Sequence, residues 1–320
     1  MAIDRNAFGF ESTTDEVLDG ISLEGRRAVI TGTSGGLGAE TARAMAARGA
    51  AITLAARDLE KLEAVAASIR ESTGNPNVDI GELDLTVPDS VRRFATNWLE
   101  SHDSLNLLIN NAGIMACPLA RTPEGWELQF ATNHLGHFLL TALLAPALVA
   151  GAPARVVNLS SGGHRFGGID FDDLHYERRD YDKWQAYGQS KSANVLFTVE
   201  LDRRLQGNGV RSFAVHPGVI MTELARHLTP DDIKDLMNRA PSDKGMVFKP
   251  VEAGAATSCW AATAPELDGR GGLYLEDCGI AEPVTSDESD HGFMPHAVDP
   301  EAAKRLWAIS EELQGVRFDT

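Results

Sequence analysis

Cysteine is scarce in this sequence, and the few residues present show no regular spacing. Cys117, Cys259 and Cys278 are odd in number and lie far apart, which excludes a disulfide framework and a paired metal or redox motif. Free thiols are the simplest interpretation, and they are typical of a reducing compartment. We therefore expect the protein to be cytoplasmic.

Positive charge is the second deficit. The chain carries 29 Lys and Arg residues against 46 Asp and Glu residues, so its formal net charge is -17, and no basic cluster interrupts this balance. Nucleic acids and anionic membranes bind proteins through cations. The composition therefore argues against both as partners.

Long apolar segments are missing as well. The longest uncharged run, residues 138–154, is short for a membrane span, contains Pro146 and ends in a Gly/Pro turn. Residues 1–20 are polar and acidic and contain no signal-peptide core. We expect no membrane partner and interpret the run as the latter part of a buried or subunit-contacting helix.

What the sequence does contain is a regular alternation of strands and helices. Hydrophobic residues make up 43% of the 320 residues, enough for a sizeable core. Short apolar runs such as 27–31, 51–55 and 105–110 alternate with helical stretches. Such alternation predicts right-handed crossovers in the α/β class, here a single-domain Rossmann-type doubly wound parallel sheet flanked by helices.

Several regions lie outside this alternation, and none is long enough to be an independent domain. We expect an N-terminal extension over residues 1–24 and one domain over residues 25–320. Within that domain, the inserts 162–183 and 222–250 are predicted to flank a substrate, and 281–300 is an acidic region near the C-terminus.

The loop 31-TGTSGGLG-38 lies between the first predicted strand and the first long helix. Gly32, Gly36 and Gly38 permit a tight turn and let backbone N–H groups approach a pyrophosphate at the helix N-terminus. Because the loop stands at the first strand–helix crossover, it predicts a dinucleotide site rather than an ordinary turn.

Two residues after the next strands bear on the choice of coenzyme. Arg57, which follows the second strand, suits a ribose 2′-phosphate and favours NADP, with NAD possible; its alternative is a solvated residue at a helix start. Asp84, which ends the third strand, is a candidate acceptor for the adenine amine, and a helix cap or turn is the equal alternative.

Six motifs together form a recognisable pattern. The chain resembles the short-chain dehydrogenase/reductase family, and within it the branch of retinol dehydrogenases and WW-domain oxidoreductase. The resemblance covers roughly residues 25–280. Its motifs are "TGTSGGLG", "NNAG" at 110–113, "NHLGHF" at 133–138, "NLSS" at 158–161, "YGQSK" at 187–191 and "HPGVIMT" at 216–222.

The resemblance implies a catalytic set of Asn133, Ser161, Tyr187 and Lys191. Tyr187 and Lys191 lie one helical turn apart, and a nearby ammonium lowers a phenol pKa from its ordinary value near 10, so the tyrosine is expected to exchange the proton. Ser161, preferred over Ser160, would donate to the substrate oxygen as charge develops there. Asn133 would hold a relay water, and Lys191 would also bind the nicotinamide ribose.

The predicted coenzyme site is larger than the glycine loop. The resemblance places Ile220 and Thr222 at the nicotinamide carboxamide, although a threonine after the Pro217–Gly218 turn is equally an N-cap. The full predicted set is Gly32, Ser34, Gly36, Leu37, Gly38, Arg57, Asp84, Leu85, Asn111, Ala112, Gly113, Tyr187, Lys191, Pro217, Gly218, Ile220 and Thr222.

Apolar residues in the two inserts favour a bulky lipophilic substrate. Candidate substrate contacts are His164, Phe166, Trp184 and Leu224. His134 and His137 lie three apart on one helix, but no third ligand or HExxH motif accompanies them, so we expect buried histidines and no metal.

These features predict an NAD(P)-dependent oxidoreductase that interconverts an alcohol and a ketone or aldehyde, with NADP(H) preferred. A non-catalytic nucleotide-binding sensor or scaffold and a double-bond reductase are the alternatives. The resemblance also implies a homodimer or homotetramer formed through the helices at 126–149 and 187–206.

Overall fold

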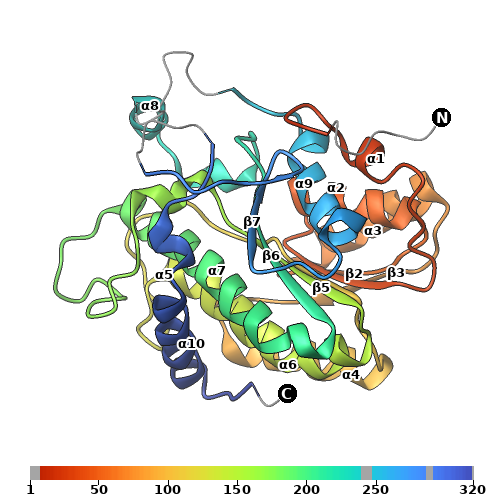
Figure 1. The fold of residues 1–320 in the computed structure, drawn as a ribbon, viewed down its shortest axis with the longest axis horizontal. Helices are drawn as coiled ribbons and strands as arrows, with labels where there is room; N and C mark the ends of the chain where they lie inside the picture. Colours follow the sequence, from red (N-terminus) through yellow and green to blue (C-terminus); the bar gives the residue numbers. More distant parts are fainter. Residues whose placement is uncertain (1–7, 239–246, 286–290, 319–320) are drawn as a thin grey trace.

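The computed structural model describes residues 8–238, 247–285 and 291–318, and it centres on one eight-stranded sheet (Figure 1). The strand order is β3-β2-β1-β4-β5-β6-β7-β8, with β8 antiparallel to β7 and the other neighbours parallel. The strands are β1 (Arg27–Thr31), β2 (Ala51–Ala56), β3 (Val78–Glu82), β4 (Leu107–Asn110), β5 (Ala154–Leu159), β6 (Val210–His216), β7 (Leu273–Glu276) and β8 (Gly279–Ile280). The predicted doubly wound sheet is confirmed, and β7 and β8 extend it beyond the strands read from the sequence.

Helices cover both faces of the sheet. On one face α2 packs on α3 and α9, and on the other α4 packs on α6 while α7 packs on β6 (Figure 1). The helices of these two layers are α2 (Gly36–Ala47), α3 (Leu59–Thr73), α9 (Val251–Thr263), α4 (Pro88–Ser101), α6 (Gly136–Ala150) and α7 (Lys183–Leu205).

Alternating strand side chains supply two separate apolar cores. In β1, Ile30 joins the core beneath α2 and α9, whereas its neighbour Val29 joins the core beneath α4, α6 and α7. The same alternation holds in β4, where Ile109 faces the first core and Leu108 the second. Because both faces are buried, these strands read in the sequence as continuous apolar runs.

The strand order reverses at the point of the sheet where the sequence predicts the coenzyme site. From β1 the chain crosses to β2 on one side, and later to β4 on the other, so the order reverses between β1 and β4. In open α/β sheets, ligands bind beyond the carboxyl ends of the strands at such a point. The glycine loop follows β1 there.

The long helix predicted near 124–149 is interrupted. It comprises α5 (Leu128–Phe130), one π-helical turn, η2 (Ala131–Leu135), and α6. By length and composition alone, Leu128–Ala150 is the one helix among the described residues that could cross a membrane, yet 78% of the window tested is buried within the protein. Its apolar character therefore matches the central helix of the second layer.

The N-terminal extension packs on the first layer. Its short helix α1 (Thr14–Val17) contacts α9 and α2, and Asp15 pairs with Arg43 of α2 at 2.9 Å. Before this helix, the Phe10 ring lies 4.6 Å from Nζ of Lys249. The described part of the extension thus contributes to the body of the domain.

A C-terminal helix, α10 (Pro300–Gln314), was not expected from the sequence. It packs along α7 (Figure 1) and contacts the first turn of α6. Its Trp307 packs edge-on against Phe138 of α6, with ring centroids 5.1 Å apart, and lies 5.8 Å from Phe197 of α7. Part of the surface predicted to join subunits is therefore already covered by the same chain. The homodimer or homotetramer stays a prediction.

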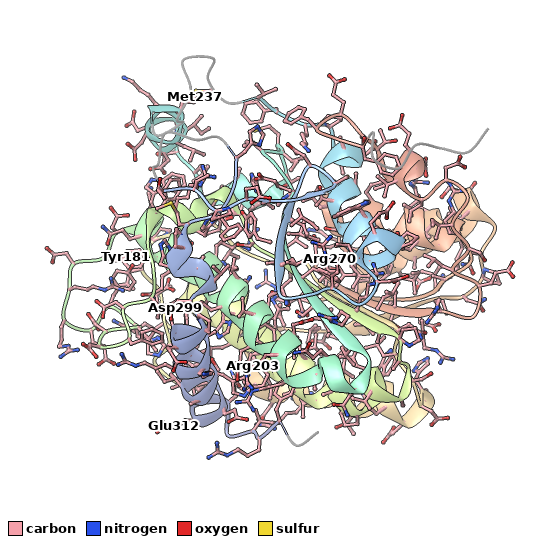
Figure 2. The ribbon with its side chains drawn as sticks, in the orientation of Figure 1. Tyr181, Arg203, Met237, Arg270, Asp299 and Glu312 are labelled. Atoms are coloured by element: carbon pink, nitrogen blue, oxygen red, sulfur yellow. The ribbon has the colours of Figure 1, made fainter. Side chains whose placement is uncertain are left out.

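The two predicted substrate inserts form irregular structure with short helices. One insert contains η3 (Gly162–Phe166), and the other contains η5 (Glu223–His227) and α8 (Pro230–Asn238), while its residues 239–246 lie outside the described residues. An ion pair between Lys183 and Asp232 ties α8 to the start of α7. Met237 on α8 is half exposed at the rim of the molecule (Figure 2). The remaining short helices are η4 (Gln206–Asn208), η6 (Pro265–Leu267) and η7 (Pro295–Val298).

Candidate active site

The predicted nucleotide loop has the geometry of a cradle. Gly32 has φ +71°, and a Cβ there would lie 2.7 Å from the Cα of Ala112, so only glycine fits. A Cβ on Gly38 would lie 2.5 Å from Asn111 Nδ2. The next segment, α2, starts after Gly35 without a side-chain cap, so its first N–H groups remain available to an anion.

A buried polar network beneath this loop was not found from the sequence. Thr31 Oγ1 accepts the N–H groups of Asn111 and Ala112, both at 3.0 Å, and lies 2.9 Å from His137 Nε2. His137 Nδ1 donates to the Asn133 carbonyl at 3.0 Å. Nε2 therefore accepts from the threonine hydroxyl, and this network joins the end of β1 to the end of β4.

Asn133 occupies the π-helical turn η2 and is fully buried. Its Oδ1 accepts from Ile114 N at 2.9 Å, and its Nδ2 donates to Ile114 O at 3.0 Å and to Ser190 Oγ at 2.9 Å. Single π-helical turns are frequent at functional sites. Asn133 is therefore a buried, fully hydrogen-bonded residue, and its predicted relay water stays a prediction.

Ser161, Tyr187 and Lys191 converge at the carboxyl end of β5. Lys191 Nζ donates to Leu159 O at 3.0 Å and lies 5.7 Å from the centroid of the Tyr187 ring. Both side chains are 3% exposed. A hydrogen bond between the side chains of Ser161 and Tyr187 acts to lower the pKa of the phenol. The three predicted catalytic residues therefore lie together in the fold.

The position of Gly113 shows how closely the predicted catalytic side chains are packed. A Cβ on Gly113 would lie 3.2 Å from Asn133 Oδ1 and 3.6 Å from Lys191 Nζ. The end of β4 therefore touches the same side chains that α7 and η2 supply. All four predicted catalytic residues thus belong to one site.

The expected electrostatic tuning differs from what the structure shows. Burial raises the pKa of Tyr187 to about 12, with the Ser161 hydrogen bond as the opposing influence, and burial lowers the pKa of Lys191 to about 8. The pKa of Tyr187 is thus raised rather than lowered as expected, because desolvation outweighs the hydrogen bond from Ser161.

Ser160 and Ser161 have different partners, which bears on the choice between them. Ser160 is buried and its hydroxyl donates to the Lys191 carbonyl at 3.0 Å. Ser161 is half-buried, caps η3 and accepts from Gly163 N at 3.0 Å. Of the two serines, Ser161 is the one that interacts with the Tyr187 side chain, and its catalytic role stays a prediction.

The other predicted coenzyme residues surround the same edge. Arg57 is exposed directly after β2, as a phosphate ligand requires. Asp84 Oδ1 accepts from Thr86 N at 2.9 Å. This oxygen therefore stabilises a turn, which was the alternative to a contact with the adenine amine. Thr222 is the N-cap of η5. Its methyl group also lies beside the glycine loop, because a Cβ built on Gly36 would be 3.4 Å from it.

The remaining members occupy the expected loops. Ser34 and Leu37 belong to the glycine loop and the first turn of α2, and Leu85 follows β3. After β6 come Pro217 and Gly218; a Cβ on Gly218 would lie 2.9 Å from the Lys249 stem. Ile220 packs against α9 at Gly254. Direct contact with a coenzyme stays a prediction for each residue.

The predicted substrate residues have unequal positions. Phe166 and Trp184 pack edge to face, 6.0 Å apart, and Leu224 is half-buried on η5. His164 is fully buried, and its Nδ1 donates to the Ser161 carbonyl at 2.7 Å while its Nε2 accepts from Met294 N at 3.1 Å. This arrangement favours a structural role for His164 over substrate contact.

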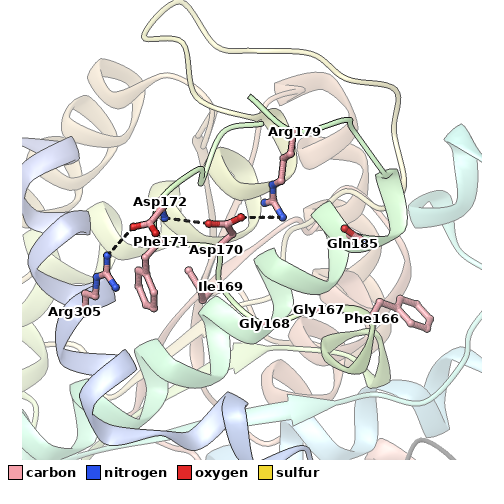
Figure 3. A pocket seen from close by; sticks show the side chains of 10 residues that line it. All are labelled: Phe166, Gly167, Gly168, Ile169, Asp170, Phe171, Asp172, Arg179, Gln185 and Arg305. Atoms are coloured by element: carbon pink, nitrogen blue, oxygen red, sulfur yellow. Dashed lines mark hydrogen bonds and ion pairs between the residues drawn. The ribbon is translucent and has the colours of Figure 1, made fainter. Parts of the chain in front are cut away.

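A groove of about 610 Å³ lies beside Phe166 on the outside of the insert (Figure 3). Its charged residues pair with each other: Arg179 with Asp170 at 3.6 Å and Arg305 with Asp172 at 3.3 Å. None of the four predicted catalytic residues lines it. The groove is therefore separate from the assembled site.

His134 and His137 point to different partners. His134 Nε2 lies 2.8 Å from Ser310 Oγ on α10, whereas His137 belongs to the Thr31 network. Burial lowers the pKa of His134 to about 3 and that of His137 to about 4, so both are neutral. Among the described residues, no group of three His, Cys, Asp or Glu side chains is placed to hold a metal ion.

Comparison with known proteins agrees with this geometry. The family model of short chain dehydrogenases matches residues 26–233. The chain belongs to the short-chain dehydrogenase family. It is 44% identical over 299 residues to human retinol dehydrogenase 12, covering 93% of this chain and 89% of that protein. Membership of the family makes the chain an oxidoreductase.

Two solved structures extend the comparison. An uncharacterized protein from Mycobacterium paratuberculosis is 38% identical, with a TM-score of 0.75, covering 97% of this chain and 100% of that one. The RhlG/NADP active-site complex from Pseudomonas aeruginosa is 26% identical, with a TM-score of 0.62, covering 80% of this chain and 95% of that one. The eight-stranded arrangement is thus a known fold.

Proposed function

We propose that this protein is an NADP(H)-preferring oxidoreductase that interconverts an alcohol and a ketone or aldehyde by hydride transfer. The observation that carries the proposal is the convergence of Ser161, Tyr187 and Lys191 at the sheet edge that also presents the glycine loop. The glycine cradle and the uncapped start of α2 fit a pyrophosphate. A nicotinamide coenzyme, when bound, supplies or accepts the hydride.

The protein side chains would manage the proton. With a pKa raised to about 12, Tyr187 is protonated at neutral pH and can donate to the substrate oxygen as it becomes an alkoxide. The Ser161 hydroxyl would donate a hydrogen bond to the same oxygen. In the oxidative direction, Tyr187 must first lose its proton, and the positive ring of the oxidised coenzyme would favour that loss.

The preference for NADP rests on Arg57. Its side chain is exposed immediately beyond β2, where an arginine suits a 2′-phosphate, and an NADP complex is known for the related RhlG protein. A charge-assisted hydrogen bond is worth about 1.5–3 kcal/mol, or roughly 10- to 100-fold in affinity.

We propose a bulky lipophilic substrate for this site. Phe166 and Leu224 bring partly exposed apolar side chains from the two inserts, whereas Trp184 is buried against Phe166, and the related human protein is named a retinol dehydrogenase. We also propose a cytoplasmic location without a nucleic-acid or membrane partner. The free state of all three cysteines and the net charge of -17 support that part of the proposal.

The decisive experiment is a panel of aldehydes, ketones and alcohols assayed with both coenzymes. We expect turnover with NADPH, and we expect Tyr187→Phe to lower kcat by about 100-fold or more while NADPH binding persists. Tyr176→Phe is the matched control, because Tyr176 is a buried tyrosine whose hydroxyl has no partner. Near-normal turnover by Tyr187→Phe would refute the proton-transfer role.

Coenzyme choice has its own test. Arg57→Ala should raise KM for NADPH by about 10-fold or more and leave KM for NADH nearly unchanged. Arg93→Ala, at an exposed position on α4, is the control. Equal turnover of the wild-type protein with NADH and NADPH would contradict the NADP preference.

A further inference from the structure

His164 connects the catalytic serine to a segment more than 100 residues later in the chain. A carbonyl can only accept, so the 2.7 Å contact with Ser161 O requires a proton on Nδ1. Met294 N then donates to the bare Nε2 at 3.1 Å. One neutral tautomer therefore satisfies both partners, and the ring is fully buried.

The main chain of residues 161–167, which we call the serine loop, also contacts the same C-terminal segment. His296 Nε2 lies 3.2 Å from the His164 carbonyl oxygen. Ser192, the neighbour of Lys191 on α7, places its hydroxyl 3.1 Å from that oxygen and 2.8 Å from Gly167 O. The loop is therefore held at its carbonyl groups as well as through the imidazole ring.

The opposite side of this loop presses on the catalytic tyrosine. A Cβ on Gly163 would lie 2.7 Å from Tyr187 Cε1, so backbone and ring are in close contact. Ser161 Oγ accepts from Gly163 N at 3.0 Å. Any shift of His164 would therefore move the Ser161 hydroxyl relative to the Tyr187 hydroxyl.

We propose that His164 is a positioning residue, which fixes Ser161 relative to Tyr187 by linking the serine carbonyl to the C-terminal segment 291–298. This inference rests on the proposed function of the site. It assigns an active-site task to a segment beyond the residues that match the family model. It also replaces the predicted substrate contact of His164, because both ring nitrogens are already engaged.

Three variants separate the two ring contacts. His164→Leu removes both, whereas His164→Asn keeps an amide donor near the Nδ1 position. Met294→Pro deletes only the donor to Nε2; the φ of -78° at Met294 is compatible with proline. We expect His164→Leu to lower kcat by about 10- to 100-fold, since small misplacements of catalytic groups have effects of that size.

The pattern among the variants distinguishes positioning from a general loss of stability. His164→Asn should recover most of kcat, Met294→Pro should fall between it and His164→Leu, and KM for NADPH should stay unchanged in all three. Ser310→Ala, which removes the partner of the buried His134 far from Ser161, should keep wild-type kcat. Wild-type kcat in folded His164→Leu would overturn the proposal.

Hydrogen–deuterium exchange gives a readout that needs no turnover. Amides of residues 161–167 should exchange faster in His164→Leu than in wild type, and close to the wild-type rate in His164→Asn. Equal exchange in wild type and His164→Leu would overturn the positioning role. Faster exchange in His164→Leu than in wild type, found together with no turnover of any carbonyl compound by the wild-type protein, would retain the link and reject only the proposed reaction.

Discussion

Lys191 is the residue for which the structure makes the sharpest energetic prediction. Its side chain is 3% exposed, and burial lowers the pKa from an ordinary 10.5 to about 8. A difference of that size corresponds to about 3 kcal/mol against the folded state whenever the ammonium is charged in both states. The catalytic lysine should therefore destabilise the protein at neutral pH.

Replacing Lys191 with methionine keeps much of the side-chain volume and removes the charge. The lost hydrogen bond to Leu159 O is worth about 1 kcal/mol, and that carbonyl keeps its bond from Asn194 Nδ2 at 2.9 Å. We expect Lys191→Met to raise the free energy of unfolding by about 2 kcal/mol at pH 7 while abolishing turnover.

The pH dependence fixes the sign of this effect. Below pH 8 the lysine is charged in both states, so the wild-type protein carries the whole desolvation penalty. Between pH 8 and 10.5 the folded protein loses its proton first, and the penalty shrinks. The advantage of Lys191→Met should therefore be greatest below pH 8 and disappear before pH 10.5, where the lost hydrogen bond leaves the variant slightly less stable than wild type.

Urea denaturation followed by tryptophan fluorescence at several pH values from 7 to about 10 measures this difference. Lys304→Met is the control, because the Lys304 ammonium is exposed on α10 and should give little change. The reasoning fails if Lys191→Met is less stable than wild type at pH 7, or if its advantage is the same at high pH.

Three further results are expected. Gly163→Ala should lower kcat by about 10-fold or more with unchanged NADPH affinity, because the new Cβ meets Tyr187 at 2.7 Å; an unaltered kcat would contradict the packing argument. The rate of alcohol oxidation should rise from pH 7 towards pH 10, because the raised pKa of Tyr187 leaves little phenolate at neutral pH; a flat profile of the chemical step would count against it. Trp307→Ala should destabilise the protein by about 3–5 kcal/mol in urea, because α10 loses its aromatic contact with Phe138; a loss under about 1 kcal/mol would show that α10 is dispensable.

Local signals explain why much of the site could be predicted. The glycine loop follows an apolar strand directly, and Tyr187 and Lys191 lie one turn apart on a helix, so each motif is contained in a few residues. The C-terminal helix was missed although its ends are marked: Asp299, labelled in Figure 2, is its N-cap, Pro300 is its first residue and Gly315 is its C-cap.

Other features had weaker signals. Asn110 and Asn158 interrupt otherwise apolar strands, and the structure pairs them across β4 and β5, with Asn110 Nδ2 donating to Asn158 Oδ1 at 2.8 Å. A polar residue in a buried run predicts a partner but does not name it. The π-helical turn at Asn133 had no sequence signal, because its residues suit an ordinary helix.

The sequence by itself determined the alternation of strands and helices as far as β6, the glycine loop and the choice of the four predicted catalytic side chains, since each signal is carried by a short motif. Only the tertiary structure decided that burial raises the phenol pKa of Tyr187. The link from His164 to Met294 and the covering of α7 by α10 were likewise decided there. Desolvation and long-range hydrogen bonds depend on which distant segments meet, and that information appears only when the sheet and its two layers are assembled.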